Sequence, residues 1–169
     1  MRAMKRWYRG PSGARCVLFL AATVGATAVS RAAEVDDEWR FAVSPFTHHW
    51  RYSEEHKPVW AIGIERQRAD DSLIGAAFFS NSFGQDSSYW YYGERYTGFW
   101  GRPEIFAQWS VGLLYGYRGK YEDKVPLNHK GFAPGALIGM GWNFNRDSSA
   151  QMHLLGDAGV MFQFNYAFR

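Results

Sequence analysis

The segment 160–168 alternates large apolar residues with small or polar ones. Side chains repeat every two residues along a strand, so each face of this segment has its own chemistry. One face carries Val160, Phe162, Phe164, Tyr166 and Phe168, and the other carries Met161, Gln163, Asn165 and Ala167. An alternating strand that ends in aromatic residues is typical of a transmembrane β-barrel, which is apolar towards lipid and more polar inside. A strand of a soluble β-sandwich has the same period.

Similar alternating segments recur between turn-rich breaks in the rest of the chain, the spacing of an all-β protein. They predict strands over residues 39–44, 60–65, 73–82, 89–96, 105–117, 136–144, 150–155 and 160–168. In segment 105–117, Trp109, Tyr115 and Tyr117 fall on the apolar face, with Gln108 and Gly112 on the other. Eight is an even number and closes the smallest common outer-membrane barrel. We therefore predict an all-β fold, an eight-stranded antiparallel transmembrane β-barrel.

The first 33 residues have the pattern of a signal peptide. Five basic residues with no acidic one precede an apolar core over 17–29 that is too short to span a bilayer. Small residues around Ala33 are suited to cleavage, with Ala28 as a second option. Cys16 precedes the apolar core, so a lipoprotein cysteine is not expected. We predict a signal peptide over 1–33 and a barrel domain over 34–169.

Cleavage changes what the composition implies. The whole chain has 19 basic and 16 acidic residues, and removal of residues 1–33 leaves 13 basic and 16 acidic ones. The mature protein is then slightly acidic and has no cysteine, so we expect neither nucleic-acid binding nor disulfides. Aromatic residues make up 18% of the chain, although no apolar run after residue 33 approaches the length of a membrane helix. That combination favours a barrel with aromatic girdles at the membrane interfaces.

Several small residues fall on the inward faces of the predicted strands: Gly63, Gly112, Gly139 and Gly141. An eight-stranded barrel is barely wide enough inside for side chains or one slender ligand. These glycines could outline a narrow lumen, or they could relieve twist in a tightly curved sheet. The pattern alone leaves both interpretations open.

The chain has no metal-ligand spacing, phosphate loop or redox motif, so we expect no metal and no cofactor. The remaining candidate chemistry is a hydroxyl with a base, Ser82 and His49. They lie at the ends of the first and third predicted strands. Up-and-down alternation puts both ends on one rim of the barrel. Spacing alone is also compatible with two unrelated surface groups.

Short motifs resemble those of the PagP family of lipid A palmitoyltransferases from Gram-negative outer membranes. Residues 47–52, Thr-His-His-Trp-Arg-Tyr, resemble the family's Thr-Trp-His-Ala-Arg-Phe, and residues 76–82, Ala-Ala-Phe-Phe-Ser-Asn-Ser, resemble Ala-Met-Ala-Phe-Lys-Asp-Ser. Tyr92-Gly93 and Val125-Pro126-Leu127 are similar to a Tyr-Gly pair and an Ile-Pro-Leu at comparable places, and Pro134 to a later proline. The resemblance covers most of the mature chain.

This resemblance implies a monomeric outer-membrane enzyme with a phospholipid donor, a lipid A acceptor and an acyl pocket inside the barrel. His49 matches the family's catalytic histidine and Ser82 its essential serine. Gly93 matches a glycine at the pocket floor that sets acyl-chain length. Pro45 and Pro134 match prolines at lateral gateways, since proline has no N–H for the ladder.

The chain departs from the family at two places. Asn81 stands where the family has an acidic residue, and an amide can orient an imidazole by hydrogen bonding but cannot hold it by charge. The family's N-terminal amphipathic helix has no counterpart between Glu34 and the first predicted strand. His48 also remains an alternative to His49, because a one-residue slip near Pro45 would exchange the two faces.

Three functions are compatible with the sequence. The first is transfer of a palmitoyl-type chain from phospholipid to lipid A. The second is a lipid A deacylase or esterase that uses the same serine and histidine with water as acceptor. The third is a non-enzymatic barrel, either structural or a passage for a small solute.

Overall fold

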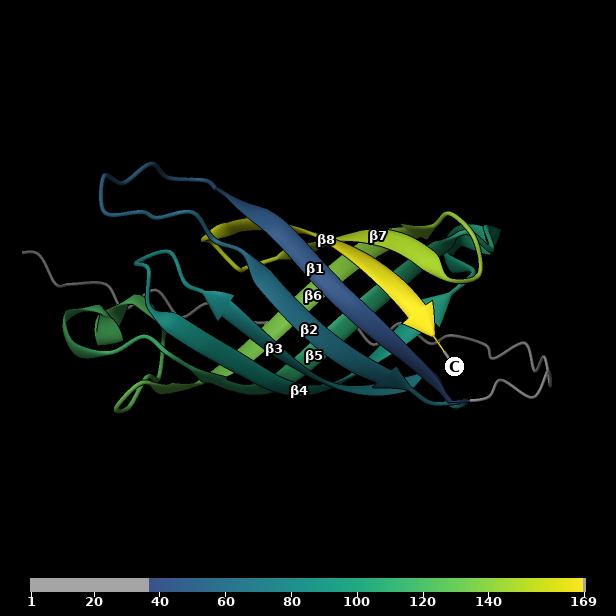
Figure 1. The fold of residues 1–169 in the computed structure, drawn as a ribbon, viewed down its shortest axis with the longest axis horizontal. Helices are drawn as coiled ribbons and strands as arrows, with labels where there is room; N and C mark the ends of the chain where they lie inside the picture. The colour runs from purple at the N-terminus through teal and green to yellow at the C-terminus, as the bar shows by residue number, and fades with distance from the viewer. Residues whose placement is uncertain (1–36, 169) are drawn as a thin grey trace, which may run out of the picture. The chain divides into compact units, whose positions relative to one another are not determined.

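The computed structural model describes residues 37–168 as a closed, antiparallel, eight-stranded barrel (Figure 1). Each strand pairs with its neighbours in the chain, and β1 pairs with β8 to close the barrel. The strands are β1 (Glu38–His49), β2 (Ala61–Gln67), β3 (Ser72–Ser80), β4 (Asp86–Thr97), β5 (Ile105–Tyr115), β6 (Phe132–Asn143), β7 (Ser148–Leu154) and β8 (Gly159–Phe168). The connections contain two 3₁₀ helices, η1 (Phe99–Gly101) and η2 (Gly119–Lys124). The predicted eight-stranded all-β barrel is confirmed, whereas the predicted signal peptide lies outside the described residues.

The outward face of the barrel is apolar and the inward face is largely polar. On β8, Phe164, Tyr166 and Phe168 are exposed, whereas Gln163 and Asn165 are buried inside. The other strands repeat this division, with exposed tryptophans at positions 39, 60, 90 and 142. A soluble barrel would have the opposite arrangement, because water would solvate its outer face. Between residues 37 and 168, no helix is both long and apolar enough to cross a membrane.

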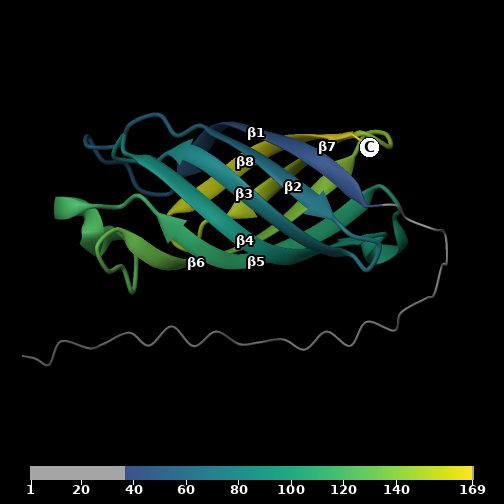
Figure 2. The ribbon, with the colours of Figure 1, turned by 60° about the horizontal axis from the view of Figure 1, so that its bottom comes forward.

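The two ends of the barrel carry different connections (Figure 2). One end carries the connections 50–60, 81–85, 116–131 and 155–158, and we call it the long-loop end. The other carries the connections 68–71, 98–104 and 144–147 together with the start of β1 and the end of β8, and we call it the short-turn end. Bacterial barrels place short turns on the periplasmic side and longer loops outside.

A bulge in β1 determines which side chains of this strand face inward. The register between β1 and β8 shifts between Val43 and Phe46, with one extra residue on β1. Before the bulge, Ala42 and Ser44 are buried inside; after it, His49 lies on the inward side. Pro45 lies at this bulge and has no N–H to donate. The alternation of the first predicted strand is interrupted at Pro45, and the bulge lets the strand continue to His49 with its faces exchanged.

Two of the strand ladders, β1–β2 and β6–β7, stop before they reach the long-loop end. Pairing of β1 with β2 extends only from Glu38 to Ser44, so the part of β1 after the bulge pairs with β8 alone. Pairing of β6 with β7 begins at Ile138, although β6 itself begins at Phe132. Pro134 lies in that first part of β6, paired with Leu113 of β5 and exposed on the outer face. Both prolines of the predicted gateways therefore lie beside a place where one ladder stops.

The interior has two halves that differ in chemistry. Towards the long-loop end the inward residues are small or apolar, namely Ala61, Gly63, Ala77, Gly112, Leu114, Leu137 and Met161; we call this part the apolar half. Towards the short-turn end most of them are polar and buried, although Leu73 and Phe106 are also fully buried there; we call this part the polar half. Its polar residues are Arg40, Glu65, Gln67, Arg95, Gln108, Gln151, His153, Gln163 and Asn165.

Two tyrosines of β4 lie between these halves. The rings of Tyr89 and Tyr91 stack with their centroids 4.8 Å apart. A Cβ added at Gly75 would lie 2.5 Å from Tyr91 Cζ, and one at Gly135 would lie 2.6 Å from Tyr89 Cε2, so the two rings reach β3 and β6. Glycine at these two positions makes room for the rings, which lie along the inner wall from β4 towards β3 and β6, and the Tyr91 hydroxyl extends to Glu65 of β2.

Candidate functional site

His49 and Ser82 meet at the long-loop end of the barrel. His49 is the last residue of β1, and Ser82 lies in the turn that follows β3. The His49 Nε2 and Ser82 Oγ atoms are 2.8 Å apart, a hydrogen bond in which the donor depends on the histidine tautomer. The backbone N–H of Lys57 also donates to the Ser82 carbonyl at 2.8 Å, which ties the connection 50–60 to this turn. The up-and-down order of the strands predicted that both residues lie on one rim of the barrel, and the structure brings the two side chains into contact there.

The structure distinguishes His49 from His48. His48 is exposed, pairs with Val160, and has its ring against Trp50 with centroids 5.8 Å apart. His49 is half-buried and faces the interior. Strict alternation from Trp39 would have placed His49 on the outer face, so the bulge at Pro45 is what directs its imidazole towards Ser82.

Asn81 is fully buried and holds the turn that presents Ser82. Its Oδ1 accepts hydrogen bonds from the backbone N–H groups of Phe83, at 2.9 Å, and Gln85, at 3.0 Å. Its Nδ2 donates to the Gly116 carbonyl and to Gln85 Oε1, both at 3.4 Å. These bonds go to the turn and to the end of β5. The structure therefore does not bring the Asn81 amide to the His49 ring, where we expected it to orient the imidazole.

Two further residues, which the sequence did not single out, surround the contact between His49 and Ser82. The ring of His56, from the connection 50–60, lies 4.5 Å from the ring of His49 between centroids, and it also contacts Phe83. Burial raises the pKa of the Tyr117 hydroxyl, and a hydrogen bond with Ser82 opposes that rise. Ser82 thus has both an imidazole and a phenol as partners.

The position of Tyr117 corrects one prediction. The alternation of segment 105–117 placed it on the apolar outer face, but β5 ends at Tyr115. Gly116 has a φ of 141°, and a Cβ there would lie 2.0 Å from Ser87 Oγ. Glycine at this position lets the chain leave the strand and carry Tyr117 over the rim, towards Ser82. Only the glycine marks this change in the sequence, and it does not say where the next side chain goes.

Gly93 lies on the inward face of β4, between Tyr91 and Arg95, and is buried. A Cβ at this position would lie 2.0 Å from the Trp109 carbonyl oxygen and 3.0 Å from Ser110 Cα. These are backbone atoms of β5, so glycine here allows a close approach of two strands. Since β4 runs from the long-loop end to the short-turn end, Gly93 is farther from Ser82 along the strand than Tyr91 is.

A buried hydrogen-bond cluster lies beneath the apolar half. Glu65, only 1% exposed, accepts hydrogen bonds from the Tyr91 hydroxyl and from Gln108 Nε2, both at 2.9 Å. The tyrosine hydroxyl and the Gln108 amide thereby stabilise a carboxylate that is closed off from water. Among residues 37–168, no group of three or more His, Cys, Asp or Glu side chains is arranged to hold a metal ion.

Comparison with protein-family models and with curated proteins finds no match for this chain. The resemblance to lipid A palmitoyltransferases therefore depends on the short motifs quoted above. What the site can do has to be argued from the geometry of His49, Ser82 and their surroundings.

Proposed function

We propose that this chain is an outer-membrane acyltransferase that moves a palmitoyl-type chain from a phospholipid to lipid A. The observation that carries the proposal is the 2.8 Å contact between His49 and Ser82 at the long-loop end, above an apolar half of the interior. A serine paired with an imidazole is a recurring arrangement for acyl transfer.

The surface of the barrel supports a location in a bilayer. Its exposed side chains include Phe41, Ile62, Trp90, Val111 and Phe164, each from a different strand. Water would not favour such an outer face, whereas a hydrocarbon environment does. Longer loops face the outside in bacterial barrels, so the site at the long-loop end would meet the outer leaflet, where lipid A resides.

The proposed reaction needs one base and one group to hold the ester. His49 Nε2 takes the proton from the acceptor hydroxyl while the acceptor oxygen forms a bond to the acyl carbon. The bond between that carbon and the glycerol oxygen of the phospholipid breaks, and the glycerol oxygen takes the proton from His49. Ser82, between His49 and Tyr117, would donate to the ester carbonyl or fix the imidazole.

The interior offers a place for one hydrocarbon chain in the apolar half. The side chains of Ala61 and Ala77 are small, and Gly63 carries none, whereas Gly112 allows a close approach of β5 to the backbone of β4. The tyrosine pair Tyr89–Tyr91 and the Glu65 cluster then close the way to the short-turn end. We propose that the acyl chain ends at these rings.

A lipid chain could enter the barrel sideways where the hydrogen bonding between two strands stops. A two-chain lipid cannot pass through a continuous hydrogen-bonded wall, so one of its chains needs a place where pairing stops. Pairing of β1 with β2 stops at Ser44, next to Pro45, and pairing of β6 with β7 is missing around Pro134. We propose these two places as the gateways for donor and acceptor.

One assay separates the three functions. Purified, folded protein in detergent is incubated with radiolabelled phosphatidylcholine and lipid A, and the products are resolved by chromatography. A more highly acylated lipid A supports the transferase. Fatty acid released without a lipid A product supports the hydrolase, for which Ser82 with His49 would serve equally well. If neither lipid is converted, the result supports the third function, a non-enzymatic barrel. Mass spectrometry of lipid A from cells with and without the gene tests the same proposal in the membrane.

A further inference from the structure

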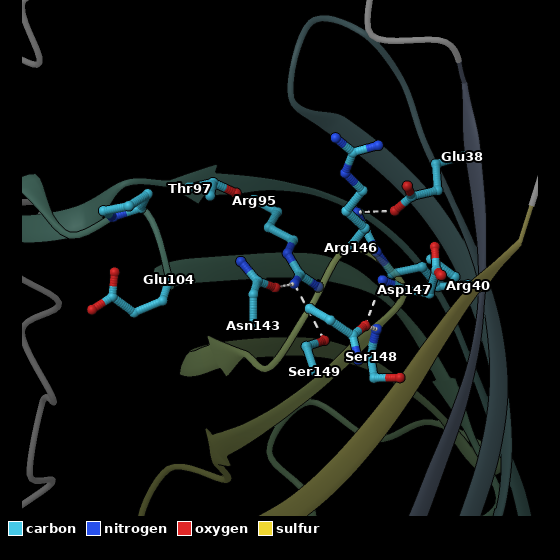
Figure 3. Close-up of a pocket in the computed structure, with 13 residues that line it drawn as sticks. Glu38, Arg40, Arg95, Thr97, Glu104, Asn143, Arg146, Asp147, Ser148 and Ser149 are labelled. Carbon is cyan, nitrogen blue, oxygen red and sulfur yellow. Dashed lines mark hydrogen bonds and ion pairs between the residues drawn. The ribbon is translucent and has the colours of Figure 1, made fainter.

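A second cavity opens at the short-turn end, away from His49 and Ser82. It has a volume of about 490 Å³, within the range of small-molecule sites, and its lining includes Arg40, Arg95, Asn143, Ser148 and Ser149 (Figure 3). The residues come from β1, β4, β6 and β7, so the cavity is the mouth of the barrel at this end. Acyl transfer at the other end makes no use of it.

Arg95 is a buried cation whose hydrogen-bond partners are neutral, while the carboxylates of Glu65 and Glu38 act on it without forming an ion pair. It is 3% exposed, and its Nη2 donates to Asn143 Oδ1 at 2.7 Å and to Ser149 Oγ at 3.3 Å. Its guanidinium carbon lies 3.4 Å from the centroid of the Phe106 ring. Among the ion pairs of the described chain none involves Arg95. Burying a charge without a counter-ion in contact is costly, so this position favours an anion.

Arg40 lines the same cavity and has a donor to spare. It is 8% exposed and its Nη2 pairs with Glu38 at 2.8 Å. The Nη1 atoms of both Arg40 and Arg95 are buried without a hydrogen-bond partner. An unpaired N–H on a guanidinium is costly, and because both Nη1 atoms are closed off from solvent, an oxyanion in the cavity would bond to them after a small rotation of the two side chains.

Among the described residues, no carboxylate at this mouth forms an ion pair with Arg95. The lining also contains Glu38, Glu104 and Asp147. Glu38 is engaged with Arg40, and Glu104 pairs with Arg102 outside the cavity at 2.7 Å. In Figure 3 the Glu104 carboxylate points away from Arg95, and the hydroxyl of Ser149 and the amide of Asn143 point towards it.

We propose that the short-turn mouth is a binding site for a phosphate-type oxyanion, held between the guanidinium groups of Arg40 and Arg95. A tetrahedral oxyanion has acceptors in several directions and matches the forked donors of arginine. The hydroxyl of Ser149 supplies a neutral donor beside them. This site does not depend on the acyltransferase proposal.

The phosphate could belong to a free ion or to a lipid headgroup, and a neighbouring groove makes the second source testable. A groove of about 290 Å³ lies on the outer face, lined by aromatic and aliphatic side chains that include Phe41, Phe144 and Phe164. Ser148 and Ser149 line both the groove and the cavity. A lipid with its phosphate in the mouth would have an apolar surface for a chain within reach.

The test is calorimetric titration of the folded full-length barrel in a non-ionic detergent. The probes are inorganic phosphate, dihexanoyl phosphatidic acid, and dihexanoyl glycerol as the same chains without phosphate. We expect saturable binding of phosphate that weakens about tenfold or more in Arg95→Gln and in Arg40→Gln, because each loses charge-assisted hydrogen bonds. Arg66→Gln is the matched control, since Arg66 lies near the same end but pairs with Asp37 on the outside.

Folding of each variant is checked by heat-modifiable mobility on gels. If Arg95→Gln fails to fold, the test uses Arg95→Lys and Arg40→Gln instead. Arg95→Lys should bind phosphate more weakly than the wild type, because lysine lacks the forked donors of arginine. If dihexanoyl phosphatidic acid binds more tightly than inorganic phosphate and dihexanoyl glycerol does not bind, the site belongs to a lipid headgroup. Equal affinity assigns it to the free ion. Absence of phosphate and phosphatidic acid binding, or equal binding by the folded arginine variants, overturns the proposal.

Discussion

The two halves of the barrel interior, built from the same eight strands, are filled in opposite ways. The apolar half presents alanines, glycines and leucines and leads up to His49 and Ser82. The polar half is occupied by Glu65, Arg95 and buried amides that bond to one another. Small apolar residues need no hydrogen-bond partners, whereas buried polar groups need them and therefore specify a single packing. We therefore expect substitutions in the first half to change chemistry and substitutions in the second to change stability.

The largest expected effect is at the contact between His49 and Ser82. In Ser82→Ala and in His49→Ala, acyl transfer should fall about 100-fold or more, because general base catalysis and the serine hydroxyl are lost. The barrel should still show heat-modifiable mobility on gels. His48→Ala is the matched control and should keep its activity, since His48 faces away from the site. Full activity in both site variants would contradict the assignment.

The next effect is on stability, in the polar half. Glu65→Gln removes the carboxylate that accepts from Tyr91 and Gln108. We expect the free energy of unfolding to fall by about 1.5 to 3 kcal/mol, the contribution of charge-assisted hydrogen bonds. Urea unfolding in lipid vesicles, followed by tryptophan fluorescence, measures it. Glu54→Gln, at an exposed position in the connection 50–60, is the control and should change little. Loss of acyl transfer in folded Glu65→Gln without loss of stability would mean that the two halves are not separate.

A smaller effect is expected at Asn81, which supports the catalytic turn. Asn81→Asp introduces the acidic residue that stands at the corresponding position of the family the motifs resemble, yet an aspartate cannot donate to the Gly116 carbonyl as the amide does. It would also bury a charge at a position that is fully closed to solvent. We expect acyl transfer to decrease by about tenfold or less, the equivalent of about 1.4 kcal/mol. A gain in activity would show instead that a carboxylate at this position reaches His49.

The smallest effect is on acyl-chain selectivity, at the boundary of the two halves. Tyr91→Ala removes a ring from the inner wall at this boundary and should shift the preference towards longer donor chains by a few fold, because only a few methylene groups gain space. Tyr91→Phe keeps the ring and should keep the preference. Relative rates with a series of phosphatidylcholines measure both. If Gly93→Met shortens the accepted chain while Tyr91→Ala leaves it unchanged, the floor lies at Gly93, as the resemblance implies.

Much of the fold could be predicted from alternation, because burial follows directly from a period of two. The inward face of Gln163, Asn165 and Ala167 on β8 was predicted in this way and is confirmed. Strand ends were less accurate, since β6 begins at Phe132 and continues through Pro134. A proline is compatible with a strand wherever its missing N–H has no partner to bond, and the shortness of β7 cannot be read from the sequence of β6.

The site could be predicted only in part. His49 and Ser82 were expected on one rim, but the inward direction of His49 depends on the bulge, and alternation alone leaves both histidines open. Asn81 was assigned to the chemistry, whereas its hydrogen bonds make it part of the turn. Tyr117 and His56 were missed because loop residues reach the site through turn geometry, for which the only local signal was Gly116.

The closure of the barrel has a consequence for when the contact between His49 and Ser82 can form. The part of β1 that carries His49 is paired only with β8, the strand made last during synthesis. Until the two ends of the chain meet, the imidazole has no neighbouring strand to hold it opposite the hydroxyl. An incompletely assembled barrel would therefore lack the contact between His49 and Ser82, and under the proposed function it would not transfer acyl chains.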